Sequence, residues 1–102
     1  MLFVIDCVDK PEHLAIRLAH REAHLTYVRG FLDHLIAAGP FLSAEGTMTG
    51  SMLIMEFDTL SEAEAFCAAD PYSLAHLFAS TTIRRWAKVL PKEHPGNEPP
   101  PL

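Results

Sequence analysis

The sequence is poor in several of the features from which a function is most easily inferred. Only two of its 102 residues are cysteines, Cys7 and Cys67, and they form no C-x-x-C pair. Two isolated cysteines in apolar surroundings predict neither a disulfide framework nor a cysteine-based metal site. Both are therefore expected to act as small buried hydrophobic side chains.

Basic runs and long apolar runs are also missing. The 8 Lys and Arg residues stand against 13 Asp and Glu, for a net charge of -5. Nucleic-acid binding requires a positive surface, so no nucleic-acid partner is expected. No apolar stretch approaches the ~18 residues that span a bilayer, and the chain start lacks the basic residues of a signal peptide. We therefore expect no membrane partner and a cytoplasmic protein.

What is present is a pattern of short strands and amphipathic helices. Strands are expected over residues 2–8, 41–45, 51–58 and 80–90. One long helix is expected over residues 10–38, with Asp9 as its N-cap, a bend near Gly30 and Gly39-Pro40 as its stop. A second helix over residues 59–69 is opened by the capping box Thr59-x-x-Glu62. Residues 73–78 are expected to add another helical turn.

This β-α-β-β-α-β order predicts an α+β fold of the ferredoxin-like type, with an antiparallel sheet and helices on one face. The other face still carries apolar side chains and needs a cover. A second subunit would supply it, which predicts a homodimer. Residues 1–90 are expected to form one domain. Residues 91–102 hold five of the eight prolines and are expected to be a proline-rich C-terminal tail.

The most unusual stretch is Arg17-Leu-Ala-His-Arg-Glu-Ala-His24, in the middle of the long helical pattern. An apolar stripe is predicted on this helix, made of Leu14, Leu18, Leu25, Val28, Leu32 and Ile36. Arg21 falls on that stripe, and Arg17 and His24 lie along its edge. Arginine is almost never fully buried without a partner. These polar groups therefore either extend to solvent or line a cavity.

His24 is the first candidate for chemistry because imidazole suits general acid–base catalysis near neutral pH. The alternative is a histidine that only bonds a backbone carbonyl. Arg17 and Arg21 are like charges spaced i and i+4, which is mildly destabilising. Their presence beside His24 is explained if an anionic group docks there or if a carboxylate neutralises them.

Asp70 is the second candidate. At the end of a helix it is either a turn former before Pro71 or the partner of a cation. If it reaches His24, it sets the imidazole tautomer. Ser51, which opens a strand after Gly50, offers a hydroxyl to a ligand, but no G-x-S-x-G elbow supports a serine hydrolase. Tyr72 and Trp86 either line a pocket or belong to the core.

Histidines also invite a metal interpretation. His13, His20 and His24 fall near one another on the helical wheel, and His20-x-x-x-His24 has the spacing of two ligands. However, no HExxH pattern is present, and such pairs are usually solvated helix faces. We therefore expect no metal site and no cofactor.

Several short motifs together resemble the YciI-like (YCII-related) family. They are Asp9-x-Pro11, Arg17-x-x-x-Arg21-x-x-His24-Leu25, Ala38-Gly39-Pro40, Thr49-Gly50-Ser51 and Asp70-Pro71-Tyr72. The resemblance implies a ferredoxin-like fold that pairs as a dimeric α/β barrel, with a His–Asp pair in a pocket that maps onto His24 and Asp70. A relative in chlorinated-aromatic breakdown is a dehydrochlorinase, so the resemblance is compatible with lyase chemistry.

One departure from the family is expected to matter. After Asp-Pro-Tyr the family usually continues through a small pair such as Ala-Gly, whereas Ala75 is followed by His76 in this chain. A bulky imidazole at that position is expected either to narrow the pocket or to add a titrating group.

Three functional hypotheses follow. In the first, the protein is an acid–base enzyme of the lyase or isomerase type. His24 moves a proton, Asp70 orients it, and Arg17 or Arg21 holds a carboxylate or enolate oxygen of a small anionic metabolite. In the second, the same pocket binds a small anion without catalysis. In the third, the dimer surface itself is the function.

Overall fold

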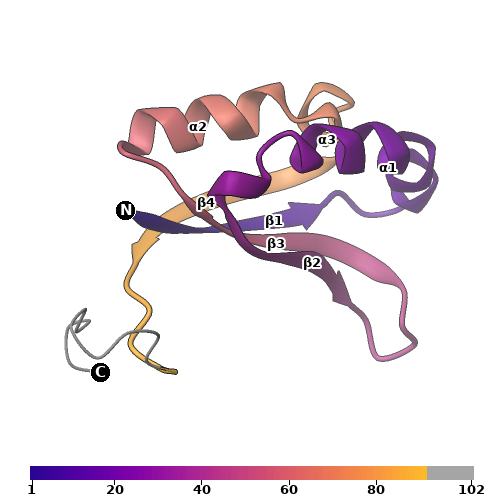
Figure 1. The fold of residues 1–102 in the computed structure, drawn as a ribbon. Coiled ribbons are helices and arrows are strands. Elements are labelled where there is room, and N and C mark those ends of the chain that lie inside the picture. Colours follow the sequence, from indigo (N-terminus) through magenta and orange to yellow (C-terminus); the bar gives the residue numbers. More distant parts are fainter. Residues whose placement is uncertain (92–102) are drawn as a thin grey trace.

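The computed structural model describes residues 1–91, so the expected tail lies outside the described residues except for Pro91. The elements are β1 (Leu2–Asp9), α1 (Leu14–Arg29), the 3-10 turn η1 (Leu32–His34), β2 (Leu35–Leu42), β3 (Met48–Glu56), α2 (Leu60–Ala69), α3 (Pro71–Leu74) and β4 (Phe78–Trp86). The strands form one antiparallel sheet in the order β2-β3-β1-β4, and the helices cover one of its faces (Figure 1). The predicted α+β ferredoxin-like fold is confirmed.

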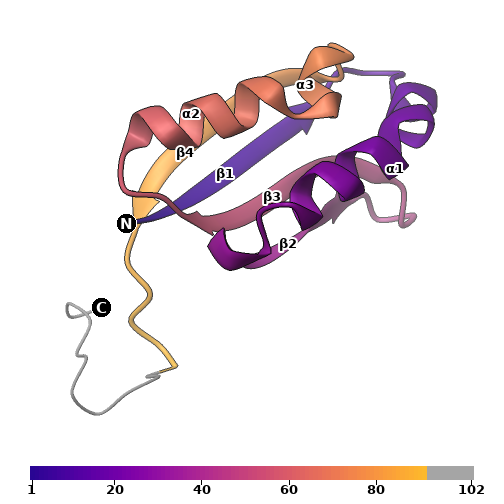
Figure 2. The same cartoon turned by 45° about the horizontal axis from the view of Figure 1, so that its top comes forward.

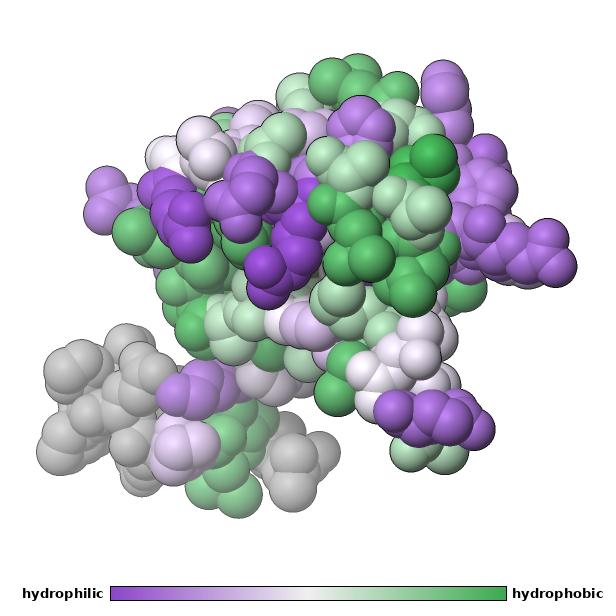
Figure 3. Space-filling model, turned by 90° about the vertical axis from the view of Figure 1, so that its right-hand side faces the viewer, coloured by the Kyte–Doolittle hydropathy of each residue, from purple (hydrophilic) through white to green (hydrophobic). Residues whose placement is uncertain are grey.

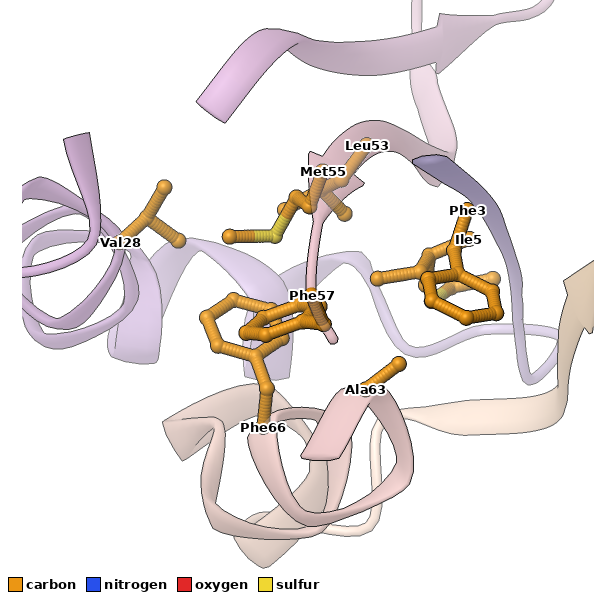
Figure 4. Close-up of a cluster of buried hydrophobic side chains, with 9 residues drawn as sticks. Phe3, Ile5, Val28, Leu53, Met55, Phe57, Ala63 and Phe66 are labelled. Carbon is orange, nitrogen blue, oxygen red and sulfur yellow. The ribbon is translucent and has the colours of Figure 1, made fainter. Parts of the chain in front are cut away.

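The core lies between the sheet and the two longer helices. In the central pair of strands, Ile5 of β1 lies opposite Leu53 of β3, and both point toward the helices. Figure 4 shows Phe57 and Phe66 at the centre of this core, with Val28 at one side and Phe3 at the other. Alternation along β1 puts one set of side chains into the core and leaves the other set on the uncovered face.

The single long helix predicted over residues 10–38 is wrong. Helix α1 ends at Arg29, where the N–H of Gly30 donates to the carbonyl of Tyr27 and the N–H of Phe31 donates to the carbonyl of Val28. The chain then reverses through η1 and returns as β2, so Gly39 and Pro40 lie inside a strand, and the predicted 41–45 strand is misplaced. An apolar run of this length fits a helix or a strand by periodicity, and pairing with β3 decides it. Because β2 is an edge strand, it tolerates proline.

The predicted apolar stripe is confirmed at Val28, which is buried, but is wrong for most of its other members. Leu14, Leu18, Leu32 and Ile36 are exposed, whereas the buried residues of α1 are Arg17, His24 and Val28. The helix is therefore rotated so that the edge of the predicted stripe is the centre of the buried face. Figure 3 looks onto the end of the molecule where α1 begins and shows apolar surface beside charged groups. Arg21, predicted on the stripe, is exposed.

The helix caps differ in part from expectation. Asp9 is not an N-cap, since it ends β1, and α1 is preceded by His13 without a side-chain cap. In α2 the Thr59 hydroxyl accepts the N–H of Glu62 as predicted, while the Glu62 carboxylate accepts the N–H of Asp58. The last strand runs over Phe78–Trp86 and the extra helical turn over Pro71–Leu74.

Figure 2 shows α1 and α2 side by side across the sheet, with α3 at the end where α1 begins. Within residues 1–91, no helix combines the length and the apolarity needed to cross a bilayer.

Candidate active site

A cavity of about 200 Å³ lies between α1, the strands β2 and β3, and α3. It is lined by five of the six residues predicted from the sequence to form a site, namely Arg17, Arg21, His24, Ser51 and Tyr72. The rest of the wall is mostly apolar. The sixth predicted residue, Asp70, contacts His24 beside the cavity. The folded chain therefore brings all six predicted residues together.

The imidazole of His24 is oriented by the carboxylate of Asp70. Nδ1 of His24 lies 2.9 Å from one carboxylate oxygen and 3.0 Å from the other, and both residues are buried. Because an ionised carboxylate only accepts hydrogen bonds, Nδ1 carries the proton, and Nε2 of the neutral ring is left with a lone pair. Among residues 1–91, no side chain or backbone group bonds Nε2, and this nitrogen is accessible to solvent. It is the ring nitrogen available to a molecule in the cavity.

Asp70 holds this position because it joins two helices. It follows the last residue of α2 and is the N-cap of α3, where its carboxylate accepts the N–H of Tyr72 at 2.9 Å. The sequence predicted only an acid at a helix C-terminus, which the macrodipole disfavours. The start of α3 provides a backbone donor that compensates for this.

Tyr72 contacts both His24 and Arg17 through its ring. The ring lies 4.0 Å from the His24 ring, centroid to centroid, with 14° between the planes. The guanidinium carbon of Arg17 lies 4.7 Å from the centroid of the Tyr72 ring. Tyr72 is buried, so it fixes the separation and the tilt of the two polar groups that border it.

Arg17 is the most constrained group of the site. Its Nε donates to Asp9 at 2.7 Å, and one of its terminal nitrogens donates both to Asp9 and to the Ser51 hydroxyl at 2.8 Å. Burial disfavours the charge, but hydrogen bonding to Asp9 and the charge of Asp9 outweigh this and raise the pKa of Arg17 above its ordinary value. Arg17 is therefore a buried cation whose charge is balanced by Asp9.

Asp9 was missed as a site residue by the sequence analysis. It was assigned as a helix N-cap because the residues that follow it favour a helix. The available signal was the presence of two arginines downstream that needed a carboxylate. The prediction considered Asp70 or a bound anion for that role, and the structure gives it to Asp9.

Arg21 differs from Arg17 in both exposure and pairing. It is exposed at the cavity, and among residues 1–91 it makes no ion pair. Burial raises the pKa of the Tyr72 hydroxyl, while the charges of Arg17 and Arg21 act in the opposite direction. Of the two arginines that line the cavity, Arg17 is balanced by Asp9, and Arg21 has no carboxylate partner within residues 1–91.

The position of Ser51 depends on the glycine before it. A Cβ on Gly50 would lie 2.4 Å from the carbonyl oxygen of Cys7, so only glycine fits this close approach of β3 to β1. Ser51 then points to the helix-covered face, opposite Cys7 and Pro40, and its hydroxyl reaches Arg17.

Other predicted candidates lie away from the cavity. His76 is exposed in a left-handed backbone conformation at φ 57° and does not line the cavity, so it does not narrow the pocket. Trp86 lies on the uncovered face of the sheet, opposite Leu2. In the described part of the chain, no three His, Cys, Asp or Glu side chains come together as a metal-ligand set.

Comparison with known proteins fits this geometry. The model of a family described as the YCII-related domain matches residues 1–87. The chain belongs to the YCII-related domain family. This YCII-related chain is 35% identical over 97 residues to Protein YciI of Escherichia coli, covering 87% of this chain and 99% of the relative. It is 34% identical, with the same coverage, to an uncharacterized protein of Haemophilus influenzae.

Solved structures give the same family context. The YCII-related chain matches the 5-chloro-2-hydroxyhydroquinone dehydrochlorinase of Burkholderia phenoliruptrix AC1100, solved in complex with 2,5-dihydroxybenzoquinone. The TM-score is 0.81 at 38% identity, covering 84% of this chain and 93% of the other. A match to an antibiotic biosynthesis monooxygenase, with a TM-score of 0.51 and 19% identity over 82% of this chain and 94% of the other, shows the fold alone.

Proposed function

We propose that this YCII-related protein is an acid–base enzyme of the lyase or isomerase type that acts on a small anionic organic molecule. The observation that carries the proposal is the orientation of His24. Asp70 occupies Nδ1 at 2.9 Å, and Nε2 is left accessible in a cavity that also contains arginine. A carboxylate-oriented imidazole with a free second nitrogen is the arrangement of a general base.

The reaction follows from the positions of these groups. Nε2 of His24 removes a proton from an acidic C–H or O–H of the substrate, and the electron pair moves onto a neighbouring carbonyl oxygen. Asp70 stabilises the imidazolium that forms. Arg17 and Arg21 stabilise the oxyanion. The pair then either expels an anionic leaving group, which is elimination, or takes up the proton at another atom, which is isomerisation.

The size and walls of the cavity support a substrate of about one ring. A cavity of about 150 Å³ can hold benzene, and this one is about 200 Å³. The dehydrochlorinase relative was solved with a one-ring dihydroxyquinone. Elimination of chloride from a hydroxylated ring is therefore the first reaction to test on this protein.

The test uses 2,5-dihydroxybenzoquinone as a ligand and 5-chloro-2-hydroxyhydroquinone as a substrate, with chloride release as the readout. We expect wild-type turnover, a loss of at least about 100-fold in kcat for His24→Gln, and a smaller loss for Asp70→Asn, which retains a helix cap. Glu64→Gln, an exposed residue outside the cavity, is the control. Catalysis would be refuted if the protein bound the ligand but neither released chloride from the substrate nor exchanged substrate protons with deuterated solvent.

A non-catalytic anion-binding module is the alternative. The observation that favours it is Arg21, the uncompensated cation at the cavity. In that case Arg21→Gln abolishes binding of 2,5-dihydroxybenzoquinone, whereas His24→Gln retains most of it and no turnover occurs in either protein. In the enzyme, Arg21→Gln raises KM, and His24→Gln lowers kcat.

We also propose that the protein is a homodimer that pairs through the uncovered face of the sheet. This face exposes Val8, Phe41, Met52 and Trp86. Exposed apolar surface of this kind marks an interaction site, and stacking of two sheets would cover it. Light scattering is expected to give a dimer for the wild type and for Leu18→Asp on the exposed side of α1, and a monomer for Trp86→Asp. A wild-type monomer at micromolar concentration would refute the dimer.

The cytoplasm is the proposed location. Its support is that Cys7 and Cys67 are both free thiols, as is usual in a reducing compartment.

A further inference from the structure

A second cavity lies at the other end of the helix layer. Its volume is about 360 Å³, and it is formed by the last turn of α1, the turn η1, the end of β3 and the start of α2. None of its lining residues lines the cavity that contains His24. The neighbours Tyr27 and Val28 on α1 face the two different cavities, so the helix separates them.

Aromatic rings form most of this second cavity. The rings of Tyr27, Phe31, His34, Phe57 and Phe66 are joined by centroid distances of 4.8 to 5.9 Å. Phe57 and Phe66 are buried and form the floor, and Figure 4 shows them lying against each other. The other three rings are only partly buried.

The polar groups of the aromatic rings are already engaged, so ring surface is what they present. The Tyr27 hydroxyl donates to the carbonyl of Phe66 at 2.8 Å. Nδ1 of His34 donates to the carbonyl of Glu56 at 2.7 Å, and the His34 ring stacks on Phe57. The engaged hydroxyl and ring nitrogen fix the orientation of two of the three partly buried rings.

The one carboxylate among the residues that line this cavity is that of Glu62. Glu62 lines it, and one oxygen of its carboxylate bonds the N–H of Asp58, which leaves the second oxygen for a ligand. No Lys or Arg is among the lining residues, and the nearest basic residue along α1 is Arg29.

We propose that this second cavity binds a small organic cation, with an alkylated ammonium group seated against the rings and near Glu62. Aromatic faces attract cations through their quadrupoles, and alkylated ammonium ions combine this attraction with a low desolvation cost. The carboxylate adds direct charge complementarity. An uncharged apolar molecule would leave Glu62 unused, and an anion would be repelled by the Glu62 carboxylate.

The experiment is an NMR titration of the full chain with choline and with its neutral isostere 3,3-dimethylbutan-1-ol. We expect amide shifts confined to residues 27–34 and 57–66, with choline binding at least about threefold more tightly than the isostere. Phe31→Leu and Glu62→Gln are each expected to weaken choline binding about three- to tenfold. Glu62→Gln keeps the side-chain volume and the oxygen that accepts the N–H of Asp58. Phe31→Leu keeps a somewhat smaller apolar side chain and removes the aromatic ring.

The matched control is Glu64→Gln on the same helix, which removes an exposed carboxylate outside the cavity and should leave choline binding unchanged. Equal affinity for choline and its isostere would overturn the cation proposal. So would shifts located around His24 or an absence of binding at 20 mM choline. An equal loss in Glu64→Gln would show that general surface charge causes the effect, which would also overturn it.

Discussion

The two halves of helix α1 bury opposite kinds of side chain against the same sheet. The segment up to His24, called the polar half below, buries Arg17 and His24, each bound to a carboxylate. The segment after His24, called the apolar half below, buries Val28 and packs the partly buried ring of Tyr27 against Phe66 of α2. A buried ion pair is often no more stabilising than apolar residues of similar volume. The comparison indicates that the apolar half supplies stability, while the polar half is explained by what it does in the cavity.

The largest effect is expected at Phe66 of α2, against which the apolar half of α1 packs. Phe66→Ala removes a buried ring that contacts Tyr27, Phe31 and Phe57, and it should lower the free energy of unfolding by about 3–5 kcal/mol. Urea denaturation followed by circular dichroism measures this loss. A cost below about 1 kcal/mol would show that this half is not the stabilising one.

The next largest effect should come from breaking the pair in the polar half. Asp9→Ala leaves the buried charge of Arg17 without its carboxylate, at a cost of about 3 kcal/mol in unfolding free energy. The double variant Asp9→Leu/Arg17→Met removes both charges and should recover most of that loss. If the double variant were as unstable as Asp9→Ala, the pair itself would be a source of stability and the comparison would fail.

Alkaline pH tests the thiol of Cys7, which lies beneath both halves on β1. Burial raises the pKa of this thiol from its ordinary 9.0 to about 11. The folded state thus keeps the proton that the unfolded chain loses first. The protonated thiol therefore adds to the free energy of unfolding. This contribution is complete below pH 9 and is lost as the pH rises toward 11, by roughly 2–3 kcal/mol. Burial also raises the pKa of Cys67, to about 12.

Denaturation curves at pH 8, 9, 10 and 11 measure this dependence. Cys7→Ala should flatten the curve of unfolding free energy against pH, although it does not remove the contribution of Cys67. An unchanged slope in that variant would contradict the assignment to Cys7.

The smallest effect is expected at His76, which belongs to neither half. Its φ of 57° places a residue with a Cβ in the left-handed region, where glycine is less strained. His76→Gly is therefore expected to raise the unfolding free energy by about 0.5–1 kcal/mol, measured by thermal or urea unfolding. Glu12→Gly, at φ 61°, is the parallel case. A loss of stability in both variants would mean that the side chains make contacts that outweigh the strain.

The fold type and the members of the site other than Asp9 were predictable, but the position of α1 was not. Local patterns were sufficient for β1, for the capping box of Thr59 and for the order of the elements. They failed between Gly30 and Leu42 because strand pairing, a contact distant in sequence, decides between helix and strand there. The rotation of α1 was missed for a related reason. Helical periodicity assigns the buried face of a helix to its apolar residues. The partners that allow Arg17 to be buried lie on other elements, β1 and β3.

The family resemblance explains His76 as well. A small pair such as Ala-Gly was the expected continuation after Tyr72. His76 has a left-handed backbone conformation, which glycine adopts with less strain. Backbone strain, and not space in the cavity, therefore explains why glycine was the expected residue at this position.

Asp70 performs two tasks with one carboxylate, since it bonds His24 and also caps α3. Asparagine, serine and threonine cap a helix nearly as well, so the fold alone would allow a descendant of this protein to exchange Asp70 at little cost. The backbone of α3 would stay in place, and Tyr72 with it, while the charge beside the imidazole disappeared. Under the proposed function, catalysis in this architecture can therefore be lost without loss of shape, and position 70 would distinguish a paralogue that has lost it.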